Sequence, residues 1–325
     1  MKKVVVTGAG GFIGRALVAS LARHEGMSVV AADNNFRGSL ETVAHAPSVS
    51  TVRCDVLDMA AVSELCQGAD LVFHLAAING TKNFYEAPAA VLEVGIIGTH
   101  NVLKASLRHG VRRVIFMSSS EVYNVPDVIP TPEAVRCIVP DVYNARFSYG
   151  GGKIAGELMT VNYLRGTGTE FMIIRPHNVY GPQMGRDHVV PELIRKIRDA
   201  GGEDAGGAPL RIHIQGTGEE TRAFIFIDDA VRAIELCAFH GAPNTTYNIG
   251  TDQEVSVKTL VAELGVALSR DVQVAPAELL LGSTPRRCPD TSKIAALGFR
   301  PEISLREGIA RTARWYWQDL ASPGA

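Results

Sequence analysis

The glycines of the segment TGAGGFIG, residues 7–14, are the first residues of the chain whose type and spacing suggest a chemical role. They follow a short apolar run and stand three apart, at Gly8, Gly11 and Gly14. In such a turn the first glycine permits a tight bend, the second lets backbone N–H groups approach a pyrophosphate, and the third lets the next helix pack closely on the strand. The N-terminus of that helix favours an anion. The spacing predicts a phosphate-binding turn, although an ordinary glycine-rich turn looks the same by itself.

Two acidic residues strengthen this interpretation. Asp33 ends the next apolar run, 19 residues after Gly14, near the spacing of roughly 20 for an acid that binds the adenosine ribose of a dinucleotide. Asp55 follows a third run, where it could meet the adenine. A carboxylate at Asp33 would accept hydrogen bonds from both ribose hydroxyls and repel a 2′-phosphate, so NAD is favoured over NADP. Arg37 lies near enough to weaken that preference unless it is a solvated loop residue.

Tyr149 and Lys153 form a second group with chemical potential, because their spacing of four places them on one face of a helix. Tyrosine normally titrates near pH 10. A neighbouring ammonium group favours its phenolate, which can remove a proton from a hydroxyl group. A surface tyrosine and a solvated lysine show the same spacing by chance. The glycines between them, Gly150 to Gly152, are poor helix formers, which suggests that another group approaches this backbone closely.

These residues need a scaffold that brings them together. Short apolar runs alternate with amphipathic segments through the first half of the chain, which predicts an α/β fold with a parallel sheet covered on both faces. The second half is less regular, with a glycine-rich loop at 201–209, and residues 321–325 read as a frayed tail. The expected strands are 3–7, 28–32, 51–54, 71–75, 114–118, 171–175 and 211–215, and the expected helices are 12–24, 88–108, 148–165, 228–240, 256–269 and 305–317.

Composition limits the classes of function. The chain has 325 residues, 46% of them apolar, and a formal net charge of −2, which suits a large domain with a smaller lobe and excludes a wholly disordered chain. It has no Lys/Arg run typical of a nucleic-acid partner and no apolar stretch near the roughly 18 residues of a membrane span. Five cysteines without a C-x-x-C pair predict free thiols in a cytoplasmic protein, with no disulfide framework and no metal site.

Further motifs extend along nearly the whole chain. They are HLAA at 74–77, SSSEVY at 118–123, YGGGK at 149–153, RPHNVYGP at 175–182, TRAF at 221–224 and RRCPD at 286–290. With the glycine turn, they closely resemble the extended short-chain dehydrogenase/reductase family that acts on nucleotide sugars. The resemblance implies a Rossmann-type doubly wound parallel sheet with a smaller, mostly C-terminal α+β substrate lobe. The NAD-binding domain would span 1–175 with about 222–248, and the nucleotide-sugar lobe 176–221 with 249–320.

The same resemblance implies the catalytic roles. Tyr149 would take a proton from a sugar hydroxyl as hydride leaves for NAD, Lys153 would also hold the nicotinamide ribose, and Ser119 would bond the substrate oxygen and Tyr149. Ser119 could instead cap the end of a strand. Ser120 and Glu121 vary with the reaction: Asp-Glu is common in 4,6-dehydratases, Ser-Glu in UDP-glucuronate decarboxylases, and simple 4-epimerases usually lack the glutamate. Glu121 could also be a salt-bridged loop acid.

Ligand contacts follow from the resemblance as well. The cofactor would contact Gly8, Gly11, Phe12, Ile13, Gly14, Asp33, Asn34, Asp55, Val56, Leu75, Ala76, Ala77, Tyr149 and Lys153. The substrate would contact Asn83, Asn178, Ile214, Gln215, Arg222, Arg286 and Arg287. Guanidinium groups match the geometry of a diphosphate, although each arginine could hold a surface ion pair that contributes little.

Three positions depart from the family pattern. Gly95 stands where asparagine is common, and this change could remove an active-site hydrogen bond. Asn124 stands where glycine is usual, and asparagine tolerates positive φ better than most residues. His177 stands where many relatives have an aromatic residue, and is either a satisfied buried histidine or a sugar contact.

We therefore expect an NAD-dependent enzyme that oxidises C4 of a nucleotide-diphosphate sugar to a 4-keto intermediate, with decarboxylation or 4,6-dehydration favoured by Ser120 and Glu121. The alternatives are a 4-epimerase, a 4-keto-sugar reductase and a noncatalytic dinucleotide-binding protein. A homodimer is expected from the resemblance, through the helices at 88–108 and 148–165.

Overall fold

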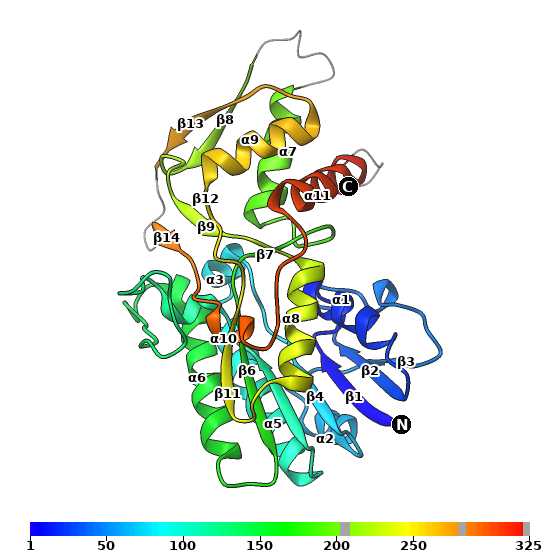
Figure 1. The fold of residues 1–325 in the computed structure, drawn as a ribbon. Helices are drawn as coiled ribbons and strands as arrows, with labels where there is room; N and C mark the ends of the chain where they lie inside the picture. Colours follow the sequence, from blue (N-terminus) through cyan, green and yellow to red (C-terminus); the bar gives the residue numbers. More distant parts are fainter. Residues whose placement is uncertain (202–208, 279–283, 321–325) are drawn as a thin grey trace.

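A seven-stranded parallel sheet lies at the centre of the protein (Figure 1). The computed structural model describes residues 1–201, 209–278 and 284–320. The strand order β11-β6-β5-β4-β1-β2-β3 has the chain winding outwards from β1 in both directions, which confirms the predicted doubly wound sheet. The strands are β1 (Lys2–Thr7), β2 (Met27–Asp33), β3 (Val49–Arg53), β4 (Leu71–His74), β5 (Arg113–Met117), β6 (Glu170–Pro176) and β11 (Thr245–Ile249).

Helices cover both faces of this sheet because its central strands are apolar on both sides. Along β1, Val4 and Val6 pack with α1 and α8, whereas Val5 packs with α2 and α5. All three valines are completely buried. The helices of the first face are α1 (Phe12–Leu21) and α8 (Ile227–His240), and those of the second are α2 (Met59–Cys66), α5 (Thr99–Arg108) and α6 (Ser148–Leu164).

The helix expected at 88–108 is not uniform. It divides into α4 (Pro88–Glu93), a π-helical turn η2 (Val94–Gly98) and α5. Two glycines lie in this turn: a Cβ on Gly98 would lie 2.6 Å from the side chain of Val56, and one on Gly95 would lie at an ordinary contact distance of 3.8 Å from the backbone of Gly152. Thr99 Oγ1 also donates to the Gly95 carbonyl at 2.6 Å. Gly95 therefore lies at a close crossing of η2 and α6.

A smaller lobe stands above the carboxyl edge of the sheet (Figure 1). It contains β8 (Leu210–Gln215) paired in parallel with β13 (Val272–Ala277), and a three-stranded sheet in the order β12-β9-β14. Around them pack α7 (Val189–Gly201), α9 (Val257–Leu268) and α11 (Leu305–Asp319). The remaining elements are β7 (Val179–Tyr180), β9 (Thr221–Ala223), β10 (Ile225–Phe226), β12 (Glu254–Ser256), β14 (Arg286–Arg287) and α10 (Ser292–Ala295).

Between the lobes, the chain passes back to the central sheet through α8 and β11 before it completes the smaller lobe. The domain limits predicted above remain a proposal. Most of the glycine-rich loop expected at 201–209, and the tail at 321–325, lie outside the described residues. Short elements near the cleft are η1 (Leu40–Thr42), α3 (Thr81–Glu86), η3 (Ser120–Tyr123) and η4 (Ala145–Phe147). Across the described ranges, the search for a helix of the length and apolarity needed to cross a membrane finds none.

Candidate active site

A cleft of about 870 Å³ separates the carboxyl edge of the sheet from the smaller lobe. Every residue that the sequence predicts for the cofactor lines it, and so do the five predicted catalytic residues. The carboxyl ends of parallel strands are where open α/β sheets generally bind ligands. Of the predicted substrate residues, only Asn178 and Arg287 line this cleft.

The glycine turn closes one end of the cleft and leaves no space for side chains. Gly8 has a φ of +71°, and a Cβ there would lie 2.7 Å from the backbone nitrogen of Ala76. A Cβ on Gly14 would overlap the carbonyl oxygen of Gly8. No side chain caps the N-terminus of α1, which begins at Phe12. The first amides of that helix therefore point towards the cleft without a capping acceptor, which suits a pyrophosphate.

Asp33 stands at the end of β2 with its carboxylate held by backbone amides. Oδ1 accepts from the Asn35 nitrogen at 2.8 Å and Oδ2 from the Gly10 nitrogen at 3.0 Å. Beside it, Asn34 donates to Asp55 at 3.1 Å. A carboxylate has about four lone-pair sites, so Asp33 retains acceptor capacity for ribose hydroxyls. The turn and Asp33 together fit the adenosine and pyrophosphate parts of NAD.

Arg37 is exposed, as the solvated loop residue considered above would be, but it also lines the cleft. Its guanidinium donates to the carbonyl oxygen of Asn79, another lining residue. It also lies close to Gly80 and Gly185, and these surroundings lower its pKa by partly desolvating the guanidinium, although the residue stays exposed. Among the described residues, no hydrogen bond joins Arg37 to the Asp33 carboxylate. The sequence showed only that Arg37 is near Asp33, because the direction of the Arg37 side chain depends on how the loop folds.

Tyr149 and Lys153 share one face of α6, as predicted, and both are buried. Ser119 hydrogen bonds with the Tyr149 hydroxyl, and the ring of Phe84 stacks on that tyrosine at 5.1 Å. Burial raises the pKa of Tyr149, and the bond from Ser119 opposes this only in part. Burial lowers the pKa of Lys153 to about 8 while Glu157 opposes the change. In this structure the surroundings favour a neutral phenol.

The Lys153 ammonium is also fixed by the main chain. It donates to the Met117 carbonyl at 2.6 Å and lies 5.6 Å from the Tyr149 ring centroid. The glycines between the pair have a packing reason, at least at Gly150, where a Cβ would lie 3.2 Å from the Glu121 carbonyl oxygen. The helix carrying Tyr149 can therefore approach the segment carrying Glu121.

Ser119 and Glu121 lie where β5 passes into η3. Ser119 caps η3 by accepting from the Glu121 nitrogen at 3.2 Å, so its capping role coexists with the bond to Tyr149. Glu121 forms an ion pair with Arg287 at 2.6 Å. Burial raises the pKa of Glu121, but the guanidinium of Arg287 outweighs it and holds that pKa below its usual range. Asn124 ends this segment with a φ of +52°, which confirms that asparagine tolerates the turn.

Arg287 has hydrogen-bonding capacity to spare. It is 6% exposed, and besides Glu121 it donates to Thr284 Oγ1 at 3.1 Å. Its Nε atom has no hydrogen-bond partner among the residues that the structure describes. An unsatisfied buried donor on a cleft wall is costly by itself. The geometry therefore suits an anionic ligand.

The other predicted substrate residues are engaged elsewhere. Arg222 donates to the carbonyls of Thr221, Thr284 and Pro285, and burial followed by the charge of Arg287 lowers its pKa to about 10. Arg286 pairs with Glu254 at 2.7 Å. The remaining residues do not line the cleft: Asn83 donates to the Asn79 carbonyl, Ile214 is buried in the core, and Gln215 is exposed.

His177 is a buried histidine rather than a contact of the open cleft. It is fully buried, lies 3.3 Å from Asn248 through Nε2, and is absent from the cleft lining. Burial lowers its pKa to about 3. Its neighbour Asn178 does line the cleft and donates to the Ala223 carbonyl at 2.9 Å. Sequence reasoning missed further lining residues: Arg37, Phe84, Arg146, Gln183, Met184, Gly185, Arg186 and His188.

Comparisons with known proteins agree with this geometry. The model of the NAD-dependent epimerase/dehydratase family matches residues 4–250. The dTDP-glucose 4,6-dehydratase of Streptomyces antibioticus is 30% identical, over 98% of this chain and 93% of that protein. The UDP-N-acetyl-alpha-D-glucosaminuronate decarboxylase of Bacillus cytotoxicus is also 30% identical, over 97% of this chain and 98% of that protein.

Solved structures show the same similarity in three dimensions. The UDP-glucose 4-epimerase of Thermotoga maritima, with UDP-glucose, has a TM-score of 0.86 at 27% identity and covers 98% of this chain and 99% of its own. The dTDP-glucose 4,6-dehydratase of Streptomyces venezuelae, with NAD bound, has a TM-score of 0.84 at 26% identity and covers 98% of this chain and 97% of its own.

Proposed function

The chain belongs to the NAD-dependent epimerase/dehydratase family, and on this premise we propose how the residues of its cleft modify a nucleotide-diphosphate sugar. It is an NAD-dependent nucleotide-sugar enzyme. One observation carries the assignment of roles: Tyr149, Ser119 and Glu121 converge on the cleft that the glycine turn closes. The cofactor is NAD, and NAD supplies a hydride acceptor and a positive charge beside Tyr149 when it is bound.

In the first step, Tyr149 accepts the proton of the sugar 4-hydroxyl while Ser119 donates a hydrogen bond to the same oxygen. Burial by itself keeps the phenol protonated, so positive charge close to the hydroxyl has to favour its ionisation. The Lys153 ammonium, with its pKa of about 8, contributes part of that charge. The C4–H bond is lost as hydride, and the sugar becomes a 4-keto intermediate.

In the second step, we assign Glu121 the proton transfers that follow oxidation. Its ion pair with Arg287 keeps it ionised in this structure, so it starts as a proton acceptor. In a 4,6-dehydration Glu121 would take the proton from C5 and give it to the hydroxyl that leaves C6 as water. In a decarboxylation the C5–C6 bond breaks, carbon dioxide leaves, and the resulting C5 enolate takes up one proton from the solvent, which Glu121 would first accept and then pass on. The hydride then returns to the sugar, so neither cycle consumes NAD.

For the substrate, we propose that Arg287 and Asn178 make direct contacts because both line the cleft. The Nε of Arg287 has no partner among the described residues and is shielded from solvent, so an oxygen of the diphosphate or of a sugar carboxylate would reach it after a small movement of its surroundings. Arg222 and Arg286 would reach the ligand only by leaving their present partners. Asn83 and Gln215 would need similar movements, and Ile214 could contribute only its backbone.

We also propose a cytoplasmic homodimer. Leu92 on α4, Ile97 on η2 and Leu158 on α6 are exposed by 37%, 49% and 61%, and α4, η2 and α6 pack side by side. A neighbouring set of exposed apolar side chains suits a protein interface. Light scattering on the purified protein should give twice the chain mass, and Leu158→Glu should reduce it to one chain. A monomeric wild type would refute the dimer.

The reaction itself is tested by incubating the protein with UDP-glucuronic acid, dTDP-glucose and UDP-glucose. Mass spectrometry separates loss of carbon dioxide, loss of water, and an isomer of unchanged mass. Glu121→Gln should slow the step after oxidation and let reduced NAD accumulate, whereas Glu219→Gln, at an exposed ion pair, should not. Full turnover by Glu121→Gln with an isomeric product would favour the 4-epimerase. A need for added NADPH would favour the reductase, and unchanged activity in Tyr149→Phe would favour a noncatalytic protein.

A further inference from the structure

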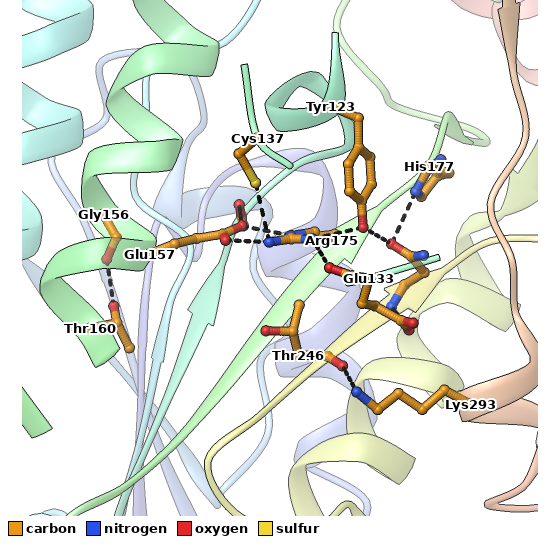
Figure 2. A network of polar contacts seen from close by, with 12 residues as sticks. Tyr123, Glu133, Cys137, Gly156, Glu157, Thr160, Arg175, His177, Thr246 and Lys293 are labelled. Atoms are coloured by element: carbon orange, nitrogen blue, oxygen red, sulfur yellow. Dashed lines mark hydrogen bonds and ion pairs between the residues drawn. The ribbon is translucent and has the colours of Figure 1, made fainter. Parts of the chain in front are cut away.

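Figure 2 shows a network of polar contacts built around buried residues, none of which has a part in the proposed proton transfers. Its centre is the ion pair of Glu157 on α6 with Arg175 on β6, at 2.6 Å. The two residues are 8% and 5% exposed, and neither lines the cleft. The pairing is bidentate, because Arg175 Nε also donates to Glu157 Oε1 at 2.8 Å. Such a fork fixes orientation as well as charge.

The network first fixes the segment that contains Ser119 and Glu121. On one side of that segment, Ser118 Oγ donates to Glu157 at 2.5 Å. On its other side, the Tyr123 hydroxyl accepts from Arg175 at 2.8 Å. The two hydrogen bonds that fix this segment, one from Ser118 and one to Tyr123, therefore both involve the same ion pair. Glu157 lies one helical turn beyond Lys153 and two beyond Tyr149, so the pair joins this segment to the helix that carries the proposed base.

The network continues towards Arg287. The Tyr123 hydroxyl donates to Asn248 Oδ1 at 2.7 Å. Asn248 Nδ2 donates in turn to the carbonyls of Thr131 and Asp290, at 2.9 and 3.2 Å. The Thr131 nitrogen donates to the Cys288 carbonyl at 2.9 Å. Through these bonds the residues directly after Arg287 are tied to the same hydroxyl that fixes the end of η3.

We propose that four residues of this network are positioning residues: Tyr123, Asn248, Glu157 and Arg175. Together they hold Glu121 at a fixed position relative to Tyr149 and to Arg287. The inference rests on the proposed function for the role of Glu121. The Tyr123 hydroxyl is the junction, because among the described residues it is the atom bonded both to the ion pair and to Asn248. Glu133 supports it with a second link, since its carbonyl accepts from Arg175 and its carboxylate accepts from the Asn248 nitrogen. Tyr123 is 1% exposed and does not line the cleft.

Stability alone is a weak explanation for this arrangement. Well-packed apolar residues often replace a buried ion pair without loss of stability. The network instead connects α6, η3, β6, β11 and the segment after β14, which are far apart in the sequence and carry the separate parts of the site. A displacement of about 1 Å at a reacting group can cost about 10²-fold in rate. Fixing these segments relative to one another therefore bears directly on the reaction.

The test variant is Tyr123→Phe, which removes the junction hydroxyl and keeps the ring. The matched control is Tyr247→Phe on β11, the strand that carries Asn248. Tyr247 is 2% exposed, and its hydroxyl accepts from the Ala242 nitrogen at 3.0 Å and lies outside the network. Amide hydrogen exchange of both proteins with added NAD is followed by mass spectrometry. In Tyr123→Phe, exchange should quicken both at 118–123 and at 286–290. In the control, neither segment should change.

The second readout is kinetic. With the substrate that the wild type turns over in the panel above, Tyr123→Phe should lower kcat about tenfold, as expected for a misplaced group, and leave KM within about twofold. Reduced NAD should accumulate transiently, because the oxidation step, in which Tyr149 accepts the proton, is less affected than the step that uses Glu121. If Tyr123 were merely structural, its replacement would lower the melting temperature and would leave unchanged how much the oxidation step and the later step each limit turnover.

The outcomes separate the two proposals. Faster exchange confined to 118–123, or equal changes in the control, overturns the network proposal even if the enzyme is active. A wild type that turns over no nucleotide sugar overturns the proposed function. In that case, exchange that quickens at both segments still supports the network as the element that holds them together.

Discussion

The two walls of the cleft hold their ligands by different physical means. The cofactor wall is backbone: at Gly8 and Gly14 a side chain would collide with Ala76 or with the Gly8 carbonyl, and the amides of α1 have no capping side chain. The substrate wall presents charged side chains that already have partners, with Arg287 paired to Glu121. The cofactor wall can therefore bind its ligand without rearrangement, whereas side chains of the substrate wall have to leave their present partners before they bind a ligand.

This difference has a thermodynamic consequence. A preformed wall costs little to organise when its ligand arrives, whereas side chains that leave an ion pair lose that interaction before gaining another. We therefore expect tight binding of NAD and weaker, more selective binding of the sugar nucleotide. Substitutions in the first wall should act through sterics, and those in the second through charge and pH.

The largest effect is expected at Tyr149, where the two walls meet. Tyr149→Phe keeps the stacking with Phe84 and removes the hydroxyl that Ser119 contacts. Loss of a positioned acid–base group should reduce turnover about 10²- to 10⁴-fold. The glycine turn is untouched, so the purified protein should keep its NAD. Turnover and cofactor content are measured on the same sample, and loss of both together would mean that the two walls are not separable.

Gly14→Ala should give the next largest effect, on the cofactor wall. The added Cβ would overlap the Gly8 carbonyl oxygen, so α1 or the turn has to move. A shift of about 1 Å should weaken NAD-dependent turnover by about 10²-fold, and added NAD should restore part of it. Gly26→Ala is a poor control because its φ is +76°, whereas Gly168 has open space and no positive φ. Gly168→Ala should therefore leave NAD titration curves unchanged.

Arg287→Met probes the charge of the substrate wall. It leaves Glu121, whose side chain is 31% exposed, without its ion-pair partner. Losing a hydrogen bond to a charged group costs about 1.5–3 kcal/mol, which corresponds to a change of about 10- to 100-fold in turnover or binding. Arg287 lowers the pKa of Glu121 against the effect of burial, so its removal should raise that pKa. A base is lost as the pH falls through its pKa. The acidic limb of the turnover profile should therefore move to higher pH.

The matched variant Arg287→Lys keeps the positive charge. It should return the acidic limb towards the wild-type position, while the loss of the guanidinium fork still raises KM. An acidic limb that stays in place in Arg287→Met would show that Glu121 is not the titrating base. The substrate wall would then act through shape rather than charge.

The residues that the sequence predicts for the cofactor all line the cleft, and for the glycine turn and Asp33 this placement depends mainly on local backbone. Gly8, Gly14 and Asp33 lie within one βαβ unit, whose geometry is nearly the same wherever it occurs. The substrate wall was predicted less well. Arg222 turns towards the carbonyls at 284 and 285, and Ile214 packs into the core. Their directions depend on how the smaller lobe packs against distant segments, which residue type and spacing do not specify. The reach of Arg37 was missed for the same reason.

The smallest effect is expected at Arg286, beside Arg287 in the sequence. Its side chain is 55% exposed and pairs with Glu254 outside the cleft lining, and exposed ion pairs contribute little. Arg286→Met should therefore leave kcat and KM within about twofold, by the same principle for exposed pairs, and should not move the acidic limb. A large rise in KM without loss of the fold would show that Arg286 leaves Glu254 to bind the substrate. Residues from outside the open cleft would then join the substrate wall when the ligand binds. The substrate wall would rearrange more on binding than its geometry without ligand indicates, and so would differ even more from the preformed cofactor wall.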